Sequence, residues 1–343
     1  MLLTAIVPNY NHGHLLPRAL EAIASQTPRP DEILVVDDAS TDDSLSVLAA
    51  LGRRAPSLRV IRHERNLGAI AALNRGVAEA RGRYIYLGSA DDLTLPGLFA
   101  LGLDLLTAHP AAAFACAECR IVDTTGAERG IRPLARPAGR TGYVPATSVP
   151  ELLRRIDYWA HTSTAVLRRD LVGAAGGLDP AFGSLADSVL VRRLALRHGF
   201  CFAPRVVAEW TLRSDGLSQS TVAAPETMQR LLEAVRERLA ADADFPPWYA
   251  DLLARRLRFA AAQVTLRSIP LRLDVIDAAA PDGTVDRAVL HAALAIPGRA
   301  GRELALAWLI LRRPPISPLA VVQTAVARRL RLPARQSSPG GPR

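Results

Sequence analysis

Three buried-looking strands in the first hundred residues each end in a cluster of polar side chains. These strand-and-cluster segments are Ile6–Asn11, Glu32–Asp43 and Tyr84–Asp92. The second and third clusters contain paired aspartates, Asp37/Asp38 and Asp91/Asp92. In open α/β sheets, ligands bind at the carboxyl ends of the strands. Aspartates gathered there suit a divalent cation and a phosphorylated ligand better than they suit packing.

Strands and helices alternate through this part of the chain. Apolar runs predict strands at Leu2–Pro8, Ile33–Val36, Leu58–Ile61 and Tyr84–Leu87. Helical spacing predicts helices at Leu15–Ser25, from the capping residues Ser40–Asp43 through Leu51, and at Ala69–Ala80. Fourfold alternation of this kind indicates βαβ units on a mostly parallel central sheet flanked by helices.

The pattern loosens after residue 97. We predict helices at Leu98–Ala108 and Asp187–His198, strands at Ala112–Val122, Thr164–Leu167 and Phe200–Val207, and loops at Asp123–Val149 and Arg213–Ser220. Beyond Ala224 the chain is helical, with breaks near residues 246–247, 281–283 and 314–315. The expected organisation is a domain of residues 1–220 with halves 1–100 and 101–220, a helical C-terminal extension 221–335, and a disordered tail 336–343.

The composition is that of a globular protein. Of the 343 residues, 49% are hydrophobic and 22% are charged. Cys116, Cys119 and Cys201 are too few for a disulfide framework, and no further His or Cys residues complete a zinc site, so we expect core packing. Met1 runs directly into the first strand, and no apolar stretch reaches the roughly 18 residues that span a bilayer. We therefore expect a cytoplasmic protein.

The charge is carried unevenly. The net charge is +9, the chain has no lysine, and no acidic residue follows Glu303, whereas seven arginines do. The segments Leu304–Leu311 and Val321–Val326 are apolar and are each followed by paired arginines. Such segments could lie on the anionic inner face of the cell membrane. Alternatively, they could pack against the domain of residues 1–220 or against a second subunit of a homodimer. We expect no nucleic-acid partner, because the basic balance alone is weak evidence for one.

The polar clusters exclude two common nucleotide motifs and leave other chemistry open. No GxGxxG follows the first strand, and the absence of lysine rules out a Walker-type loop. Tyr10 fits either a stacking surface for a base or a buried turn residue. Asp37 and Asp38 could accept from a ribose hydroxyl or a base N–H, or Asp38 could cap the next helix. Because Ser40 and Asp42 are better placed for capping, we expect both aspartates to be free of structural duties.

Asp91 and Asp92 carry the metal hypothesis. Adjacent carboxylates repel each other unless a cation lies between them or one is protonated. Mg²⁺ or Mn²⁺ commonly bridges substrate phosphates to one or two protein carboxylates. The alternative is a solvated acidic turn before Pro96.

Taken together, these segments resemble the family 2 inverting glycosyltransferases of the GT-A fold. The matching residues are Val7–Asn11, Ser25–Thr27, Glu32–Asp43, Arg65–Gly68, Asn74–Gly76, Gly82–Ile85, and Ala90–Asp92 with Pro96. A fainter match continues to about Ser220 through His161–Thr164, Arg168–Arg169, Gly176–Asp179, Phe182, and Asp187 with Arg193–Leu194. Arg213–Ser218 resembles a family loop that closes over the donor.

The resemblance implies a metal-dependent, inverting, hexosyltransferase-type enzyme. It would move a sugar from a nucleotide-sugar donor, expected to be UDP-linked, to a hydroxyl of a glycan or lipid-linked acceptor, as in cell-surface polysaccharide synthesis. Asp187 would be the general base, and Asp91 and Asp92 would hold Mn²⁺ or Mg²⁺. The nucleotide would be held by Pro8, Asn9, Tyr10, Asp37, Asp38, Asn66, Gly68, Asp91 and Arg213.

Two departures from the family pattern keep rival functions open. Ser89 stands where the family often has Asp, which leaves open whether Asp91 or Asp92 binds the metal. Ala186 stands where the family has a Glu before the base. One rival is therefore a catalytically impaired glycan- or nucleotide-binding protein of the same fold. The other is a sugar-nucleotide nucleotidylyltransferase, although residues 8–13 lack the Gly-rich, basic loop typical of that class.

Overall fold

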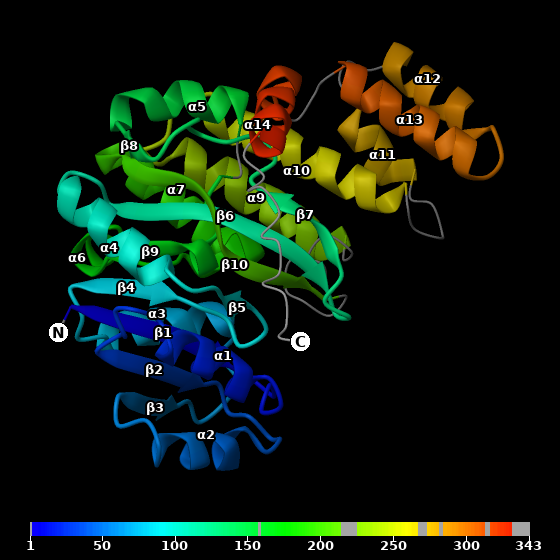
Figure 1. The fold of residues 1–343 in the computed structure, drawn as a ribbon. Coiled ribbons are helices and arrows are strands. Elements are labelled where there is room, and N and C mark those ends of the chain that lie inside the picture. The colour runs from blue at the N-terminus through cyan, green and yellow to red at the C-terminus, as the bar shows by residue number, and fades with distance from the viewer. Residues whose placement is uncertain are drawn as a thin grey trace, which may run out of the picture.

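One mixed sheet of ten strands, covered by helices on both faces, forms the body of the protein (Figure 1). This computed structural model describes residues 2–156, 159–213, 225–266, 273–280, 284–312 and 316–330. The predicted loop after Arg213 and the predicted tail 336–343 lie outside these residues. The strand order is β3-β2-β1-β4-β9-β6-β10-β5, with β7 beside β6 and β8 beside β10.

The strands are β1 Leu3–Asn9, β2 Glu32–Asp37, β3 Leu58–Arg62, β4 Tyr84–Leu87, β5 Leu93–Thr94, β6 Phe114–Asp123, β7 Glu128–Arg132, β8 Gly142–Val144, β9 Ala165–Arg168 and β10 Phe200–Leu212. The helices of the body are α1 Leu16–Ala24, α2 Ser44–Gly52, α3 Ala69–Glu79, α4 Leu98–Ala108, α5 Val149–Arg155, α6 Arg169–Ala174 and α7 Ala186–His198. The C-terminal helices are α9 Pro225–Ala240, α10 Tyr249–Thr265, α11 Leu273–Ala279, α12 Thr284–Leu294, α13 Arg299–Arg312 and α14 Pro318–Leu330.

The first half of the sheet is parallel, as the alternating pattern predicted. β1 pairs in parallel with both β2 and β4, and β2 pairs in parallel with β3. The register places Pro8 beside Val36 and Asn9 beside Asp37. The polar clusters at the ends of β1 and β2 therefore meet at one edge of the sheet, where ligand sites of this architecture form.

The second half contains antiparallel strands, and here the sequence prediction was partly wrong. β9 runs antiparallel to both β4 and β6. Residues 123–149, predicted to be a loop, include β7 and β8, which are short and lie at the margin of the sheet. β10 continues past Val207 to Leu212, with register shifts around Pro204, a residue that cannot donate a ladder hydrogen bond.

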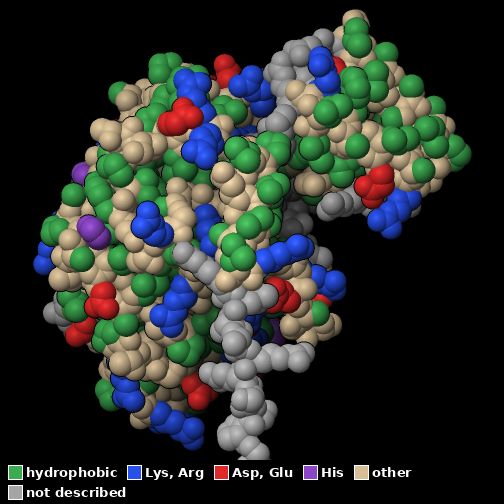
Figure 2. Space-filling view, turned by 45° about the horizontal axis from the view of Figure 1, so that its top comes forward, with side chains coloured by type: hydrophobic (Ala, Val, Ile, Leu, Met, Phe, Trp, Pro, Cys, Tyr) green, Lys and Arg blue, Asp and Glu red, His purple; other side chains and the backbone are tan. Residues whose placement is uncertain are grey.

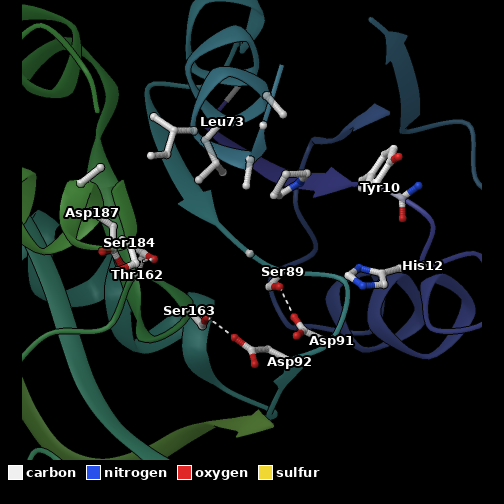
Figure 3. Close-up of a pocket in the computed structure, with 18 of the residues that line it drawn as sticks. Tyr10, His12, Leu73, Ser89, Asp91, Asp92, Thr162, Ser163, Ser184 and Asp187 are labelled. Carbon is white, nitrogen blue, oxygen red and sulfur yellow. Dashed lines mark hydrogen bonds between the residues drawn. The ribbon is translucent and has the colours of Figure 1, made fainter. Parts of the chain in front are cut away.

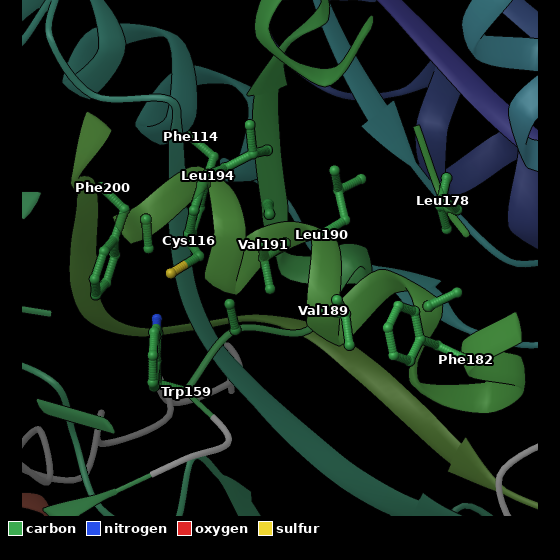
Figure 4. Close-up of a cluster of buried hydrophobic side chains, with 14 of the residues drawn as sticks. Phe114, Cys116, Trp159, Leu178, Phe182, Val189, Leu190, Val191, Leu194 and Phe200 are labelled. Atoms are coloured by element: carbon green, nitrogen blue, oxygen red, sulfur yellow. The ribbon is translucent and has the colours of Figure 1, made fainter. Parts of the chain in front are cut away.

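Helix α7 lies in the middle of the largest hydrophobic cluster. Leu190 and Leu194 of this helix are buried in that cluster together with Phe114, Trp159 and Phe200 (Figure 4). The Phe200 ring stacks on Phe114 at a centroid distance of 5.2 Å and on Trp159 at 5.6 Å. Packing on this scale fixes the position of α7 and of the residues at its N-terminal end.

The C-terminal helices share this core and add a second, smaller one. Val235 of α9 and Leu253 of α10 are buried in the same cluster as α7. The smaller cluster joins α10 to the helices that follow it, through Ala262, Leu266, Ile276, Leu290, Ala305 and Leu309. Among the described helices, none is both long and apolar enough to cross a lipid bilayer.

The three cysteines lie in the interior, as expected of packing residues. Cys116, Cys119 and Cys201 are all buried and none forms a disulfide. Burial raises the pKa of the Cys116 thiol well above its usual value. These thiols are therefore neutral at physiological pH.

Glu32 joins four segments at the opposite edge of the sheet from the polar clusters. Its carboxylate accepts hydrogen bonds from Thr4 Oγ1 at 2.8 Å, Arg59 Nε at 2.9 Å and the Arg81 backbone N–H at 3.1 Å. Burial by itself would raise the pKa of Glu32, but these three donors outweigh it and hold the pKa below the ordinary 4.5. The charged form thus stabilises the fold.

We predict that Glu32→Gln lowers the free energy of unfolding by about 2 kcal/mol at neutral pH, because buried donors lose their charged acceptor. The stabilisation by Glu32 is present above its unfolded-state pKa and is lost as the pH falls through the lower folded-state pKa. Urea unfolding of wild type and variant should therefore converge in acid. The exposed Glu64→Gln is the control, and an equal loss in both variants would contradict this role.

Candidate active site

A cavity of about 480 Å³ opens at the carboxyl ends of β1 and β4 (Figure 3). Helix α3, the start of α7 and the end of β10 complete its walls. In Figure 3, Asp187, Ser184 and Thr162 lie on one side of it, and Tyr10 and His12 lie on the other. Of the residues predicted from the sequence, the lining contains Pro8, Asn9, Tyr10, Asp38, Asn66, Gly68, Asp91, Asp92, Asp187 and Arg213.

Asp37 is the one predicted site residue that the lining does not include. It is fully buried, and its carboxylate accepts hydrogen bonds from Asn9 Nδ2 at 2.8 Å and Ser40 Oγ at 2.6 Å. Ser40 Oγ in turn accepts from the Asn11 backbone N–H at 3.0 Å. The expectation that Asp37 is free of structural duties is therefore wrong, because it ties the loop after β1 to the loop after β2.

Asp38 lines the cavity but is also engaged. Its Oδ2 accepts from the Gly68 N–H at 2.7 Å, and its Oδ1 accepts from the Leu67 N–H at 2.9 Å and lies 2.7 Å from His63 Nδ1. The expectation of a free carboxylate was wrong here too. Gly68 adopts a φ of 90°, which favours glycine, so Asp38 holds a special turn at the start of α3.

Asp91 and Asp92 differ sharply in their surroundings. Asp92 is buried, with Ser163 Oγ donating to its Oδ2 at 2.6 Å and the Thr211 N–H donating to its Oδ1 at 3.2 Å. Asp91 is only half-buried and accepts a hydrogen bond from Ser89 Oγ through its Oδ1. Asp92 thus ties the loop after β4 to β10 and to the segment before β9, while Asp91 faces the cavity (Figure 3).

The environment of Asp92 shifts its titration. Burial raises the pKa of Asp92 to about 6, and the neighbouring Asp91 charge acts in the same direction. His161 and the hydrogen bonds from Ser163 and Thr211 act in the opposite direction. In mild acid, Asp92 is therefore protonated in part, which reduces the repulsion between the two carboxylates.

The cavity fits a cation that is held largely by a substrate. Within the described ranges, no three His, Cys, Asp or Glu side chains are grouped as a metal site. Mg²⁺ and Mn²⁺ bound with nucleotides need only one or two protein carboxylates, because substrate phosphates supply further ligands. Asp91 suits that duty better than Asp92, whose two oxygens already accept hydrogen bonds from the protein.

Asp187 lies in the first turn of α7 and faces the cavity from the side opposite Tyr10 (Figure 3). Its Oδ2 accepts from Thr162 Oγ1 at 3.3 Å, and its Oδ1 accepts from the Ser188 N–H at 2.6 Å. Ala186, which replaces the family's Glu, is buried in the core cluster. The fold thus brings Thr162 to the Asp187 carboxylate, which faces the cavity.

Several lining residues were missed by the sequence analysis. His12, Leu73 and Ser163 have no site role in the sequence prediction, yet all three line the cavity. His161 and Trp210 also line the cavity, and their rings lie 5.4 Å apart. The run His161–Thr164 carries a sequence signal, because it is a polar segment directly before a buried strand.

Comparison with known proteins places this fold and cavity among sugar-transferring enzymes. Residues 4–171 match the family model described as Glycosyl transferase family 2. Over 241 residues, the chain is 30% identical to an uncharacterized protein of Mycobacterium tuberculosis, covering 68% of this chain and 74% of that protein.

Two solved structures share the fold at low sequence identity. The first is the mannosyltransferase PcManGT of Pyrobaculum calidifontis in complex with GDP-Man and Mn²⁺, with a TM-score of 0.56 and 22% identity over 94% of this chain and 86% of that chain. The second is S. aureus TarS in complex with UDP-GlcNAc, with a TM-score of 0.58 and 17% identity over 96% of this chain and 92% of that chain. The architecture is that of the GT-A glycosyltransferases. The chain belongs to glycosyl transferase family 2 and is a glycosyltransferase.

We predict that Asp92→Asn makes stability less dependent on pH. Because the folded-state pKa is raised above the ordinary 3.8, Asp92 loses stabilising protonation as the pH rises from 3.8 through about 6. The variant cannot ionise, so it should gain on the order of 2 kcal/mol over wild type between mildly acidic and neutral pH. Urea unfolding across this range tests the change. The control is the exposed Asp104→Asn, whose free energy of unfolding should differ from that of wild type by the same amount at each pH. If the difference between Asp92→Asn and wild type also did not change with pH, the burial argument would be refuted.

Proposed function

We propose that this chain is a metal-dependent inverting glycosyltransferase that uses a nucleotide-diphosphate sugar, preferably UDP-linked, as its donor. One observation carries the proposal: Asp91 and Asp187 line the same cavity as residues at the ends of β1 and β2. The donor complexes of PcManGT with GDP-Man and of TarS with UDP-GlcNAc support a nucleotide-sugar donor.

The nucleotide would occupy the side of the cavity formed by Pro8, Asn9 and Tyr10. The Tyr10 side chain is 41% exposed at the rim, which leaves a ring available for stacking on a base. Asp38 accepts from the Leu67 and Gly68 N–H groups, and Asn66 Oδ1 also accepts from the Gly68 N–H, so the turn before α3 presents a fixed surface to the base or ribose. Arg213 lines the cavity and is suited to neutralise a diphosphate.

Mn²⁺ or Mg²⁺, held by Asp91 with Asp92 behind it, would offset the charge that grows on the leaving diphosphate. Asp187 would accept the proton of the acceptor hydroxyl as the new glycosidic bond forms. A single displacement on the face opposite the leaving group gives inversion. Thr162 and Ser188 hold the Asp187 carboxylate, which supports a working base despite Ala186 and argues against the impaired-protein alternative.

The acceptor would enter beside Asp187, so residues 1–100 would serve the nucleotide and residues 101–220 the acceptor. Ser184 lies beside Asp187, and the cavity lining also includes Leu73, Leu178 and Trp210, so a hydroxyl group and apolar contacts are both available. Such a mixture is suited to a sugar hydroxyl of a glycan or lipid-linked acceptor. A role in polysaccharide synthesis completes the proposal, with residues 221–335 as a helical extension whose helices α9, α10 and α14 pack on the main core.

We predict that Asp187→Asn reduces kcat for sugar transfer by roughly 100- to 10,000-fold, because an amide cannot accept the acceptor proton. The KM for donor should change little, since Asp187 lies on the opposite side of the cavity from Tyr10. Release of nucleoside diphosphate from a panel of nucleotide sugars measures both constants. Asp104→Asn, an exposed carboxylate on α4, serves as the matched control. Transfer that survives Asp187→Asn would assign the base elsewhere.

We also predict that Asp91→Asn removes the effect of metal on nucleotide binding. Adding UDP should raise the melting temperature of wild type further when Mn²⁺ is present, because ligand binding stabilises by mass action. In Asp91→Asn, the extra increment from Mn²⁺ should be lost, while the UDP shift without metal is retained. Asp104→Asn should behave as wild type. An unchanged Mn²⁺ increment in Asp91→Asn would rule out this ligand.

A further inference from the structure

The C-terminal helices carry most of the exposed large hydrophobic side chains. Of the fifteen such residues in the described part of the chain, ten follow residue 272. They fall mainly into two groups, over the α12–α13 pair and over α14, and Figure 2 shows hydrophobic side chains gathered over both on one face of the molecule. Monomeric proteins rarely leave apolar side chains clustered on the surface without a partner.

The first group surrounds an apolar groove between α12 and α13. Its lining consists of Val289, Ala292, Ala293, Ile296, Leu304, Ala307, Trp308 and Leu311. Leu304 is 52% exposed and Leu311 is 73% exposed. The opposite side of the same helices is already buried, because Leu290, Ala305 and Leu309 form the small core with α10. The groove is therefore a second apolar face of this helix pair.

The second group is a stripe along the outer face of α14. Leu319, Val322, Val326 and Leu330 lie at helical spacing and are 50–81% exposed. The inner face is occupied instead, since Ala320 is buried in the main core and Thr324 Oγ1 accepts from the Arg136 N–H at 2.9 Å. The stripe cannot turn inward without breaking these contacts.

A buried ionic group fixes the orientation of α14. Glu118 of β6, only 2% exposed, accepts from Arg136 Nε and Nη2 at 2.8 Å and from Arg328 Nη2 at 2.7 Å. Arg328 also donates to the Pro133 carbonyl at 2.6 Å. Removing one member of such a buried group is costly, so α14 is held to the body with its apolar stripe outward.

Basic residues lie at both ends of the stripe, and acidic ones are missing from it. Ser317 N–H donates to the Arg155 carbonyl at 2.8 Å, which places the exposed Arg154 and Arg155 of α5 beside the start of α14. Arg329 is exposed at the other end, and residues 304–330 contain no Asp or Glu. Two copies joined through this stripe would bring arginines together without acidic partners. The charge therefore favours an anionic partner over a second copy.

We propose that the outer stripe of α14, together with the α12–α13 groove, docks on an anionic lipid bilayer. The apolar side chains enter the headgroup–acyl boundary and the arginines contact lipid phosphates, as in helices that lie in the plane of a membrane. This mode of binding needs no spanning helix. The membrane proposal does not depend on the donor chemistry, so it can be tested independently of the proposed transfer reaction.

The test is flotation of the full-length protein with vesicles of phosphatidylcholine containing roughly 30% phosphatidylglycerol. Wild type should float with these vesicles, should remain unbound with pure phosphatidylcholine, and should dissociate in about 0.5 M NaCl. The double variant Val322→Glu/Val326→Glu should weaken binding by at least about tenfold, because both side chains leave the apolar phase. Arg329→Gln should weaken binding to a smaller extent.

Val60→Glu, at an exposed position on β3, is the matched control and should bind as wild type. Circular dichroism and release of nucleoside diphosphate show that the double variant is folded and active. The proposal would be overturned if the double variant still floated with the anionic vesicles. It would also be overturned if wild type floated with neither kind of vesicle. A double variant that converts a dimer to a monomer would overturn it as well, since the stripe would then be an interface between copies.

Discussion

The site depends on one buried carboxylate that lies outside the cavity lining. Asp37 joins Asn9 and Ser40 at the ends of β1 and β2, and Ser40 in turn accepts from the Asn11 backbone. Without this acceptor, the buried Asn9 amide and the Ser40 hydroxyl would lose their partner, at a cost of about 1–3 kcal/mol for each buried group left unsatisfied. The loops that carry Tyr10 and Asp38 are thus held by hydrogen bonds beneath the cavity.

Each pair of adjacent aspartates is divided between structure and the cavity. Adjacent side chains at these strand ends have different surroundings, and the two members of a pair have different hydrogen-bond partners. In the first pair, Asp37 is buried beneath the cavity and Asp38 lines it; in the second, Asp92 is bound to Ser163 and Thr211, and Asp91 faces the cavity. The difference in burial is what raises the pKa of Asp92. In each pair, one aspartate is buried and joins segments of the fold, and the other is closer to the cavity.

The sequence was sufficient where the physics is local and insufficient where it depends on tertiary contacts. Apolar runs alternating with helical spacing predicted the parallel half of the sheet, and the rule of strand ends identified the part of the cavity lining that follows β1, β2 and β4. Nothing local distinguishes Asp37 from Asp38, since their duties depend on partners such as Asn9 and Gly68, about thirty residues away. β7 and β8 were missed because short marginal strands need no apolar alternation.

The position of Asp187 follows from packing rather than from its neighbours in sequence. Helix α7 lies in the main core, and Arg193 and Arg197 on the same helix bond to Asp242 and Asp244 in the turn between α9 and α10. Helix α7 is therefore held between the sheet and the C-terminal helices, and Thr162 Oγ1 donates to the Asp187 carboxylate at its N-terminal end. Ala186, directly before Asp187, is buried in this core and also contributes to the cavity lining. The position of Asp187 thus depends on packing with the C-terminal helices, none of whose described residues lines the cavity.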